Sequence, residues 1–255
     1  MMRRLEVIGL ENLGEVRRGD SIARLILKGC SHNNVALTEG DILVVAHKIV
    51  SKSEGRIVRL AEIQPSAHAL ELSRELNDKD PRLLQIILSE SRRIIRKGGG
   101  TIIVESHHGF VCANAGVDLS NVGLGMVALL PQDPDRSARE IREEIQKLSG
   151  VAIGVIISDS FGRPWRLGTV DVAVGVSGLK PLKDERGRND RYGYELKASV
   201  AAVADELAAA AEPVMGKRGE VPVAIIRGDG VEIKEEDGSV KDLLRPEAED
   251  LFRHF

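Results

Sequence analysis

Residues 151–158, Val-Ala-Ile-Gly-Val-Ile-Ile-Ser, form an apolar, β-branched run with no charged side chain. A run of this length and composition predicts a buried β-strand. Residues 41–50 are similarly apolar and β-branched and follow an acidic and glycine-containing stretch, so they predict a second buried strand. Residues 169–176 and Val221–Arg227 predict two more. The chain is therefore expected to fold around a buried sheet.

Helices and hairpins lie between these runs. Ser66, after Pro65, is a predicted N-cap for a helix. Further helices are predicted over 82–97, from a cap at Ser137 to about Leu148, and over the alanine-rich residues 195–212, with short strands near 101–105 and 110–113. A mixture of hairpins and helices favours a mixed α/β or α+β fold over a regular doubly wound sheet.

The composition excludes several classes of protein. Charged residues nearly balance to a formal net charge of -3, whereas a general nucleic-acid binder needs an excess of lysine and arginine. The chain has no apolar run long enough to span a bilayer, so no membrane partner is expected. Its two cysteines, Cys30 and Cys112, are too few and too far apart for a disulfide framework. These features favour a soluble protein of the reducing cytoplasm.

Two polar segments carry carboxylates that suit a hard cation. Asp118 lies in the loop 114–123, which is rich in small polar residues; the alternative is an ordinary Asx-turn. Asp159 and Ser160 follow directly after the predicted strand 151–158, where ligand sites of α/β proteins gather. Their oxygens suit Mg²⁺ or Mn²⁺, although an aspartate here can equally cap the next turn.

Four further loops carry cations or glycines that can bind anions, but each has a solvated surface loop as its alternative. They are 51–56 with Lys52, 161–168 with Arg163 and Arg166, 183–193 with Arg188, and 215–221 with Lys217. The chain has neither a Walker-type P-loop nor a strand-linked G-x-G-x-x-G motif. The sequence thus offers carboxylates for a hard metal and cations for an anion, and it shows no evident covalent nucleophile. This combination suits phosphoryl transfer, which depends on positioning and charge neutralisation.

The order of several motifs resembles one enzyme family. The motifs are Val50–Arg56, Val111–Asn121, Ile156–Arg163, Gly175–Gly178, Gly187–Gly193 and Val214–Gly216. Over residues 1 to about 228 the sequence resembles the coenzyme F420-0:L-glutamate ligases. The resemblance implies an unusual mixed α/β, mixed-sheet fold that forms an intertwined homodimer. It also implies a catalytic region over 1–228, with sub-boundaries near 60 and 135, and a charged tail over 229–255.

The resemblance further implies an activity. Enzymes of this family use GTP and Mg²⁺ or Mn²⁺, with K⁺ as a further candidate cofactor, to convert the lactyl carboxylate of F420-0 into an acyl phosphate. The amine of L-glutamate then displaces phosphate, and a second, γ-linked glutamate can follow. Two alternatives remain open: a ligase of this family that acts on another acid, and a non-catalytic nucleotide-binding module.

Site residues follow from the resemblance by motif. Asp118, Asp159 and Ser160 are expected to hold metal, and Arg163, Arg166 and Arg188 are candidate catalytic residues that bind the acceptor or glutamate. The expected GTP contacts are Leu13, Gly14, Glu15, Val16, His47, Lys48, Lys52, Asn121, Met215, Gly216, Lys217 and Gly219. Lys217 stands where relatives often carry a metal-binding Gln or Glu, and a protonated lysine cannot coordinate a cation. In relatives this Gln or Glu binds a second metal. Here the second metal is then bound by another residue, with Glu220 as a candidate, or is absent. Lys217 can instead contact phosphate.

Overall fold

The computed structural model describes residues 3–228, 233 and 237–251. Its main sheet has five strands in the order β1-β12-β2-β8-β9, in which only β2 and β8 run parallel to each other. The strands are β1 (Leu5–Leu10), β2 (Ile42–Ala46), β8 (Gly154–Arg163), β9 (Arg166–Ser177) and β12 (Val223–Gly228). The prediction of a mixed α+β fold with a mixed sheet is confirmed.

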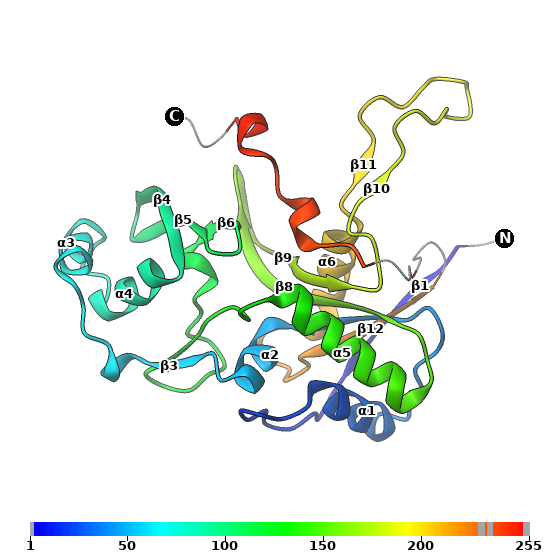
Figure 1. Cartoon of the computed structure of the whole chain (residues 1–255), viewed down its shortest axis with the longest axis horizontal. Helices are drawn as coiled ribbons and strands as arrows, with labels where there is room; N and C mark the ends of the chain where they lie inside the picture. The colour runs from blue at the N-terminus through cyan, green and yellow to red at the C-terminus, as the bar shows by residue number, and fades with distance from the viewer. Residues whose placement is uncertain (1–2, 229–232, 234–236, 252–255) are drawn as a thin grey trace.

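Helices cover both faces of this sheet (Figure 1). Along β2, Leu43 and Val45 pack in one apolar cluster with α1 (Ile22–His32) and α5 (Pro134–Ser149). The alternate residues Ile42 and Val44 pack in another with α6 (Val203–Met215). Because both faces are buried, the central strands need apolar residues at consecutive positions, which explains the runs in the sequence.

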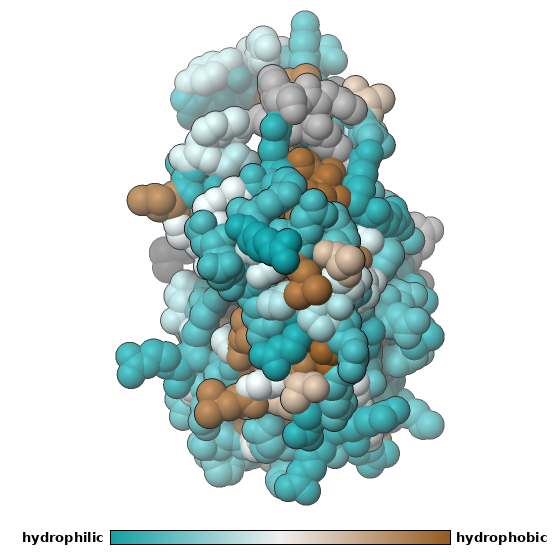
Figure 2. All heavy atoms as spheres, turned by 90° about the vertical axis from the view of Figure 1, so that its left-hand side faces the viewer, coloured by the Kyte–Doolittle hydropathy of each residue, from teal (hydrophilic) through white to brown (hydrophobic). Residues whose placement is uncertain are grey.

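Part of the chain that connects β2 to β8 forms a smaller lobe with its own core. It contains α3 (Ala67–Glu75) and α4 (Pro81–Ser89), with β4 (Ser91–Gly98), β5 (Thr101–Ser106) and β6 (Val111–Ala113) in one sheet, and β3 (Ile57–Arg59) paired with β7 (Met126–Ala128). Leu72, Leu84 and Ile87 are almost fully buried in this core. The outer face on the α3 side is mostly hydrophilic, with only scattered apolar side chains (Figure 2).

One segment projects from the main body, and another, near the C-terminus, packs against it. Strands β10 (Lys183–Asp184) and β11 (Val200–Ala201) form the base of a long projecting arm (Figure 1). Near the C-terminus, η3 (Val240–Leu243) buries Val240 in the core beside α1 and α5, and Ser239 donates a 2.7 Å hydrogen bond to Asp135. A single turn, η4 (Glu247–Glu249), follows.

Several predicted elements were wrong. The strand predicted over 41–50 ends at Ala46, and α2 (His47–Glu54) begins at once. The helix predicted over 82–97 ends at Ser89, and residues 91–98 form strand β4. Each of these segments has only two adjacent apolar residues (Ile49 and Val50, Ile94 and Ile95), which fit either period, so its partners in the fold decide. In the second case the partner is β5, which pairs with the β-branched Ile94.

The alanine-rich helix also differs from its prediction. It begins at Val203 rather than 195, and it continues past Pro213 to Met215. Residues 200–201 instead pair with β10, so tertiary pairing outweighs the helix propensity of the alanines. The cap of α5 is Asp133, with Pro134 in the first turn, rather than Ser137. The loop predicted over 161–168 is a tight hairpin, because β8 extends to Arg163 and β9 begins at Arg166.

Among the described residues, none of the helices combines the length and apolar character that a bilayer crossing needs.

Candidate active site

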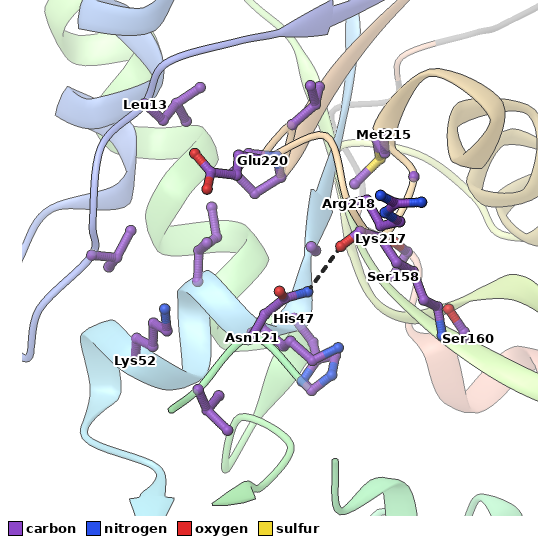
Figure 3. A pocket seen from close by; sticks show the side chains of 18 of the residues that line it. Leu13, His47, Lys52, Asn121, Ser158, Ser160, Met215, Lys217, Arg218 and Glu220 are labelled. Atoms are coloured by element: carbon purple, nitrogen blue, oxygen red, sulfur yellow. Dashed lines mark hydrogen bonds between the residues drawn. The ribbon is translucent and has the colours of Figure 1, made fainter. Parts of the chain in front are cut away.

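A cavity of about 950 Å³ lies where β2 ends and its parallel pairing with β8 stops, at Ala46 and Ser158. Its volume is in the range of small-molecule sites, and the carboxyl ends of parallel strands are where such sites form. Segments that are far apart in the sequence line it: 12–16, 46–49 with Lys52, 121–123, 158–160 with Asp171, Glu212, 215–218 and 220–222. Figure 3 shows how their side chains converge on the cavity.

The middle of β8 supplies polar side chains to both faces of the sheet. Asp159 and Ser160, expected directly after the strand, lie within it, because β8 continues to Arg163 and stays paired with β9. Successive residues of a strand point to opposite faces, so Asp159 lies on the α2 side while Ser158 and Ser160 lie on the α6 side. A shift in the β8–β9 register next to Ser158 marks the position where these polar residues begin. Such irregularities are common beside functional sites because they redirect side chains.

Two carboxylates and an imidazole form a candidate metal centre. Single ligand atoms of His47, Asp118 and Asp159 all lie within 4.8 Å of one another. Asp159 and His47 are buried, and His47 Nε2 has no hydrogen-bond partner among the described residues. Two carboxylates around an unpaired buried acceptor fit a divalent cation. The structure therefore brings together the two predicted metal-binding aspartates, which are 41 residues apart in the sequence.

Lys48 pairs with one of these carboxylates. Its Nζ lies 2.7 Å from Asp118 Oδ2, and Ser120 N donates to Asp118 Oδ1 at 2.7 Å. Burial alone would raise the pKa of Asp118, but the hydrogen bonds from Lys48 and Ser120 outweigh it, so the pKa lies below its ordinary value. Asp118 is thus held as a carboxylate, the form that binds a cation.

Ser160 is held by an acidic residue that the sequence analysis missed. Asp171 of β9 is buried opposite Ser160, whose Oγ donates to Asp171 Oδ1 at 2.6 Å. Ser158 Oγ donates to the other oxygen of Asp171 at 3.1 Å. With its proton directed at Asp171, the Ser160 hydroxyl turns its lone pairs elsewhere and can act as an oxygen ligand. The signal in the sequence was an aspartate within the otherwise apolar strand 169–176.

Basic side chains also line the cavity. Lys52 Nζ lies 2.6 Å from Glu15 Oε1, and Asn121 Nδ2 donates to the backbone oxygen of Lys217 at 3.2 Å (Figure 3). Lys48, Lys52 and Lys217 and the first turn of α2 thus offer positive groups to the cavity, which acidic side chains line as well. Such a surface is suited to a polyphosphate.

The nearest thiol does not provide a nucleophile. Burial, followed by the negative charge of Asp159, raises the pKa of Cys112 to about 12. The thiol therefore stays protonated at neutral pH, and a thiol attacks only as its thiolate.

Most of the predicted site residues meet at this cavity. Asp159, Ser160 and all predicted nucleotide contacts except Gly219 line it, and Asp118 belongs to the adjoining metal cluster. His47 is the first residue of α2 rather than part of a strand. Arg218, which also lines the cavity, belongs to the predicted loop 215–221. Asn12 and Glu212 line the cavity too but were missed, because each lies beside a predicted segment and carries no motif of its own.

The three predicted catalytic arginines lie elsewhere. Arg163 and Arg166 flank the tight turn of the β8–β9 hairpin, and Arg188 lies on the projecting arm beside Glu185. Among the described residues that line the cavity, none is one of these three arginines. Their catalytic role stays a prediction.

Comparison with known proteins agrees with the motifs. Residues 11–228 match the family described as F420-0:gamma-glutamyl ligase. The chain belongs to this family. The coenzyme F420:L-glutamate ligase of Methanothermobacter thermautotrophicus is 50% identical over 98% of this chain and 99% of its own. A ligase of the same name from Methanocaldococcus jannaschii is 46% identical over 99% of this chain and 98% of its own. Another, from Methanopyrus kandleri, is 47% identical over 98% of this chain and 97% of its own. Every segment that lines the cavity falls within the residues that match the F420-0:gamma-glutamyl ligase family.

Proposed function

We propose that this protein is a GTP- and divalent-metal-dependent ligase that joins L-glutamate to the lactyl carboxylate of F420-0. The observation that supports the proposal is the meeting of Asp118 and Asp159 at the cavity that Asp159, Lys48 and Lys52 line. The names of its full-length relatives supply the acceptor and the amino acid.

The proposed reaction proceeds in two displacements. A carboxylate oxygen of F420-0 attacks the γ-phosphorus of GTP, GDP leaves, and an acyl phosphate forms. The glutamate amine then attacks the acyl carbon, phosphate leaves with the bonding electrons, and the nitrogen loses a proton. Repetition of the sequence at the new γ-carboxylate adds a second glutamate. No residue is acylated, which agrees with the protonated Cys112 thiol.

The cavity residues act by positioning and charge neutralisation. Asp118 and Asp159, and Ser160 from the other face of β8, would hold the metals, Mg²⁺ or Mn²⁺, which when bound shield phosphate charge from the approaching carboxylate. Lys48, Lys52 and the first amides of α2 bind phosphate oxygens. Lys217 offers a further phosphate contact, and Glu220, which lines the same cavity, is the candidate ligand for a second metal. K⁺ remains a further proposed cofactor, and Arg163, Arg166 and Arg188 remain proposed contacts of the anionic acceptor and glutamate.

The decisive assay combines phosphate release with product mass. With GTP, Mn²⁺ or Mg²⁺, L-glutamate and F420-0, phosphate release is expected only when all components are present. The product should be heavier than F420-0 by one or two glutamyl units. Replacement of GTP by ATP tests the nucleotide preference, and omission of K⁺ tests its role. Nucleotide binding without this product would reject F420-0 as the acceptor.

We also propose that the protein is a homodimer. Large apolar side chains are exposed on the β8–β9 hairpin (Trp165 and Leu167) and on the arm (Tyr192 and Tyr194), and such side chains are typical of interfaces. Light scattering after size exclusion should give twice the chain mass of 27.7 kDa. Trp165→Ser combined with Leu167→Ser should shift the mass toward the monomer, whereas a monomeric wild-type protein would contradict the proposal.

A further inference from the structure

We propose that His47 is a nitrogen ligand of the divalent cation, and that it makes the site prefer a transition metal such as Mn²⁺ over Mg²⁺. The inference rests on the metal site of the proposed function and reassigns His47 from nucleotide contact to metal ligand. It concerns which cation the site selects, a property that the two carboxylates alone do not determine.

The position of His47 is fixed by the fold. It is the first residue of α2, directly after β2, and only 2% of it is exposed. Its Nε2 lies 3.3 Å from Asp159 Oδ1 and has no hydrogen-bond partner among the described residues. A buried polar atom without a partner is costly, so an imidazole held here points to a group that binds it.

The other ring nitrogen indicates the tautomer. His47 Nδ1 lies 3.4 Å from Ser51 Oγ, and the Ser51 hydroxyl already donates to Leu129 O at 2.6 Å. The serine oxygen can therefore only accept from the imidazole, which places the proton on Nδ1. In the neutral imidazole, Nε2 then carries its lone pair toward the Asp159 carboxylate. This is the arrangement of a metal-binding histidine, whose second nitrogen donates to a neighbouring acceptor.

Two facing lone pairs need a cation between them. Ligands bound at roughly 2.1–2.3 Å and at right angles are separated by roughly 3.0–3.3 Å, and the distance from Nε2 to Asp159 Oδ1 is 3.3 Å. Asp118 lies within 4.8 Å of both, close enough to complete a third position after a small side-chain rotation. The rival explanation is an imidazolium that donates to Asp159, which would bind no metal through nitrogen.

A nitrogen ligand changes which cation is favoured. Mg²⁺ prefers a shell made only of oxygens, whereas imidazole favours divalent transition metals. Mn²⁺ accepts carboxylates as well and so suits two aspartates with one histidine. Replacement of His47 by glutamine keeps a polar group of similar reach but offers an amide oxygen. His47→Gln should therefore lower the ratio of Mn²⁺ to Mg²⁺ affinity by at least about tenfold.

The test observes the ligand directly, without turnover. The full-length protein is loaded with Mn²⁺, alone and with a non-hydrolysable GTP analogue, and pulsed paramagnetic resonance is recorded. We expect a ¹⁴N coupling that changes to a ¹⁵N pattern when only histidine is ¹⁵N-labelled. His47→Gln should abolish this coupling, whereas the matched control His68→Gln, on the exposed surface of α3, should retain it.

The outcomes separate this inference from the proposed function. Bound Mn²⁺ without histidine coupling would overturn the role of His47 but leave the carboxylate metal site intact. Coupling that persists in folded His47→Gln would assign the nitrogen to another residue and also overturn the proposal. If Mn²⁺ binds neither alone nor with the GTP analogue, both the role of His47 and the carboxylate metal site are overturned. The labelled wild-type protein tests the nitrogen ligand even if His47→Gln does not fold.

Discussion

Asp118→Asn and Asp159→Asn are each expected to lower kcat by about a thousandfold or more. Each change removes one of the two anionic ligands that meet at the cavity, and loss of metal-assisted charge neutralisation costs several kcal/mol of transition-state stabilisation. At about 1.4 kcal/mol per factor of ten, that corresponds to about three orders of magnitude. The measurement is glutamate-dependent phosphate release from GTP at saturating metal.

The control for these variants is Asp78→Asn. Asp78 lies in the exposed turn between α3 and α4 with a φ of 56°, a conformation that asparagine adopts as readily. Its activity and unfolding temperature should match those of the wild type. The site variants should retain the wild-type circular dichroism, because both carboxylates lie at the edge of the cavity rather than within an apolar cluster. Wild-type activity in either of them would remove that residue from the metal site.

Asp41→Ala is expected to lower the free energy of unfolding by about 3–5 kcal/mol. Asp41 is fully buried at the start of β2, where its two oxygens accept 2.8 and 2.7 Å hydrogen bonds from Arg227 of β12. Thr38 N and Oγ1 also donate to it. Removal of the carboxylate leaves all these donors, including a guanidinium, without their acceptor. Urea unfolding followed by circular dichroism measures the change.

A matched ion pair on the surface provides the comparison. Asp184 accepts hydrogen bonds from Arg186 through both oxygens, as Asp41 does from Arg227, but both partners lie exposed on the arm. Exposed pairs contribute little because water screens them, so Asp184→Ala should leave the urea midpoint unchanged. Equal effects of the two substitutions would show that burial does not determine the strength of the Asp41 pair.

The sequence predicted best what depends on local pattern and burial. The strand run 151–158 was recognisable because both faces are buried, and the loops carrying Asp118, Asp159 and Lys52 were recognisable by their polar residues and motifs. Helix α2 and strand β4 were not predicted, because short apolar segments fit either period until their partners are known. Asp171 was missed because its partners, Ser158 and Ser160, are opposite it only once β8 and β9 pair. The contact of His47 with Asp159 depends likewise on the end of β2 lying beside β8.

The ion pair between Lys48 and Asp118 means that the protein carries its own counter-ion at the proposed metal centre. A divalent cation that binds Asp118 would have to displace the Lys48 ammonium group. The measured affinity for the cation would then include the cost of breaking the ion pair between Lys48 and Asp118. The displaced ammonium remains on the wall of the same cavity, where a phosphate is the natural anion for it to meet. In the proposed ligase, cation and nucleotide binding would then be thermodynamically linked, and each would raise the affinity for the other by the same factor.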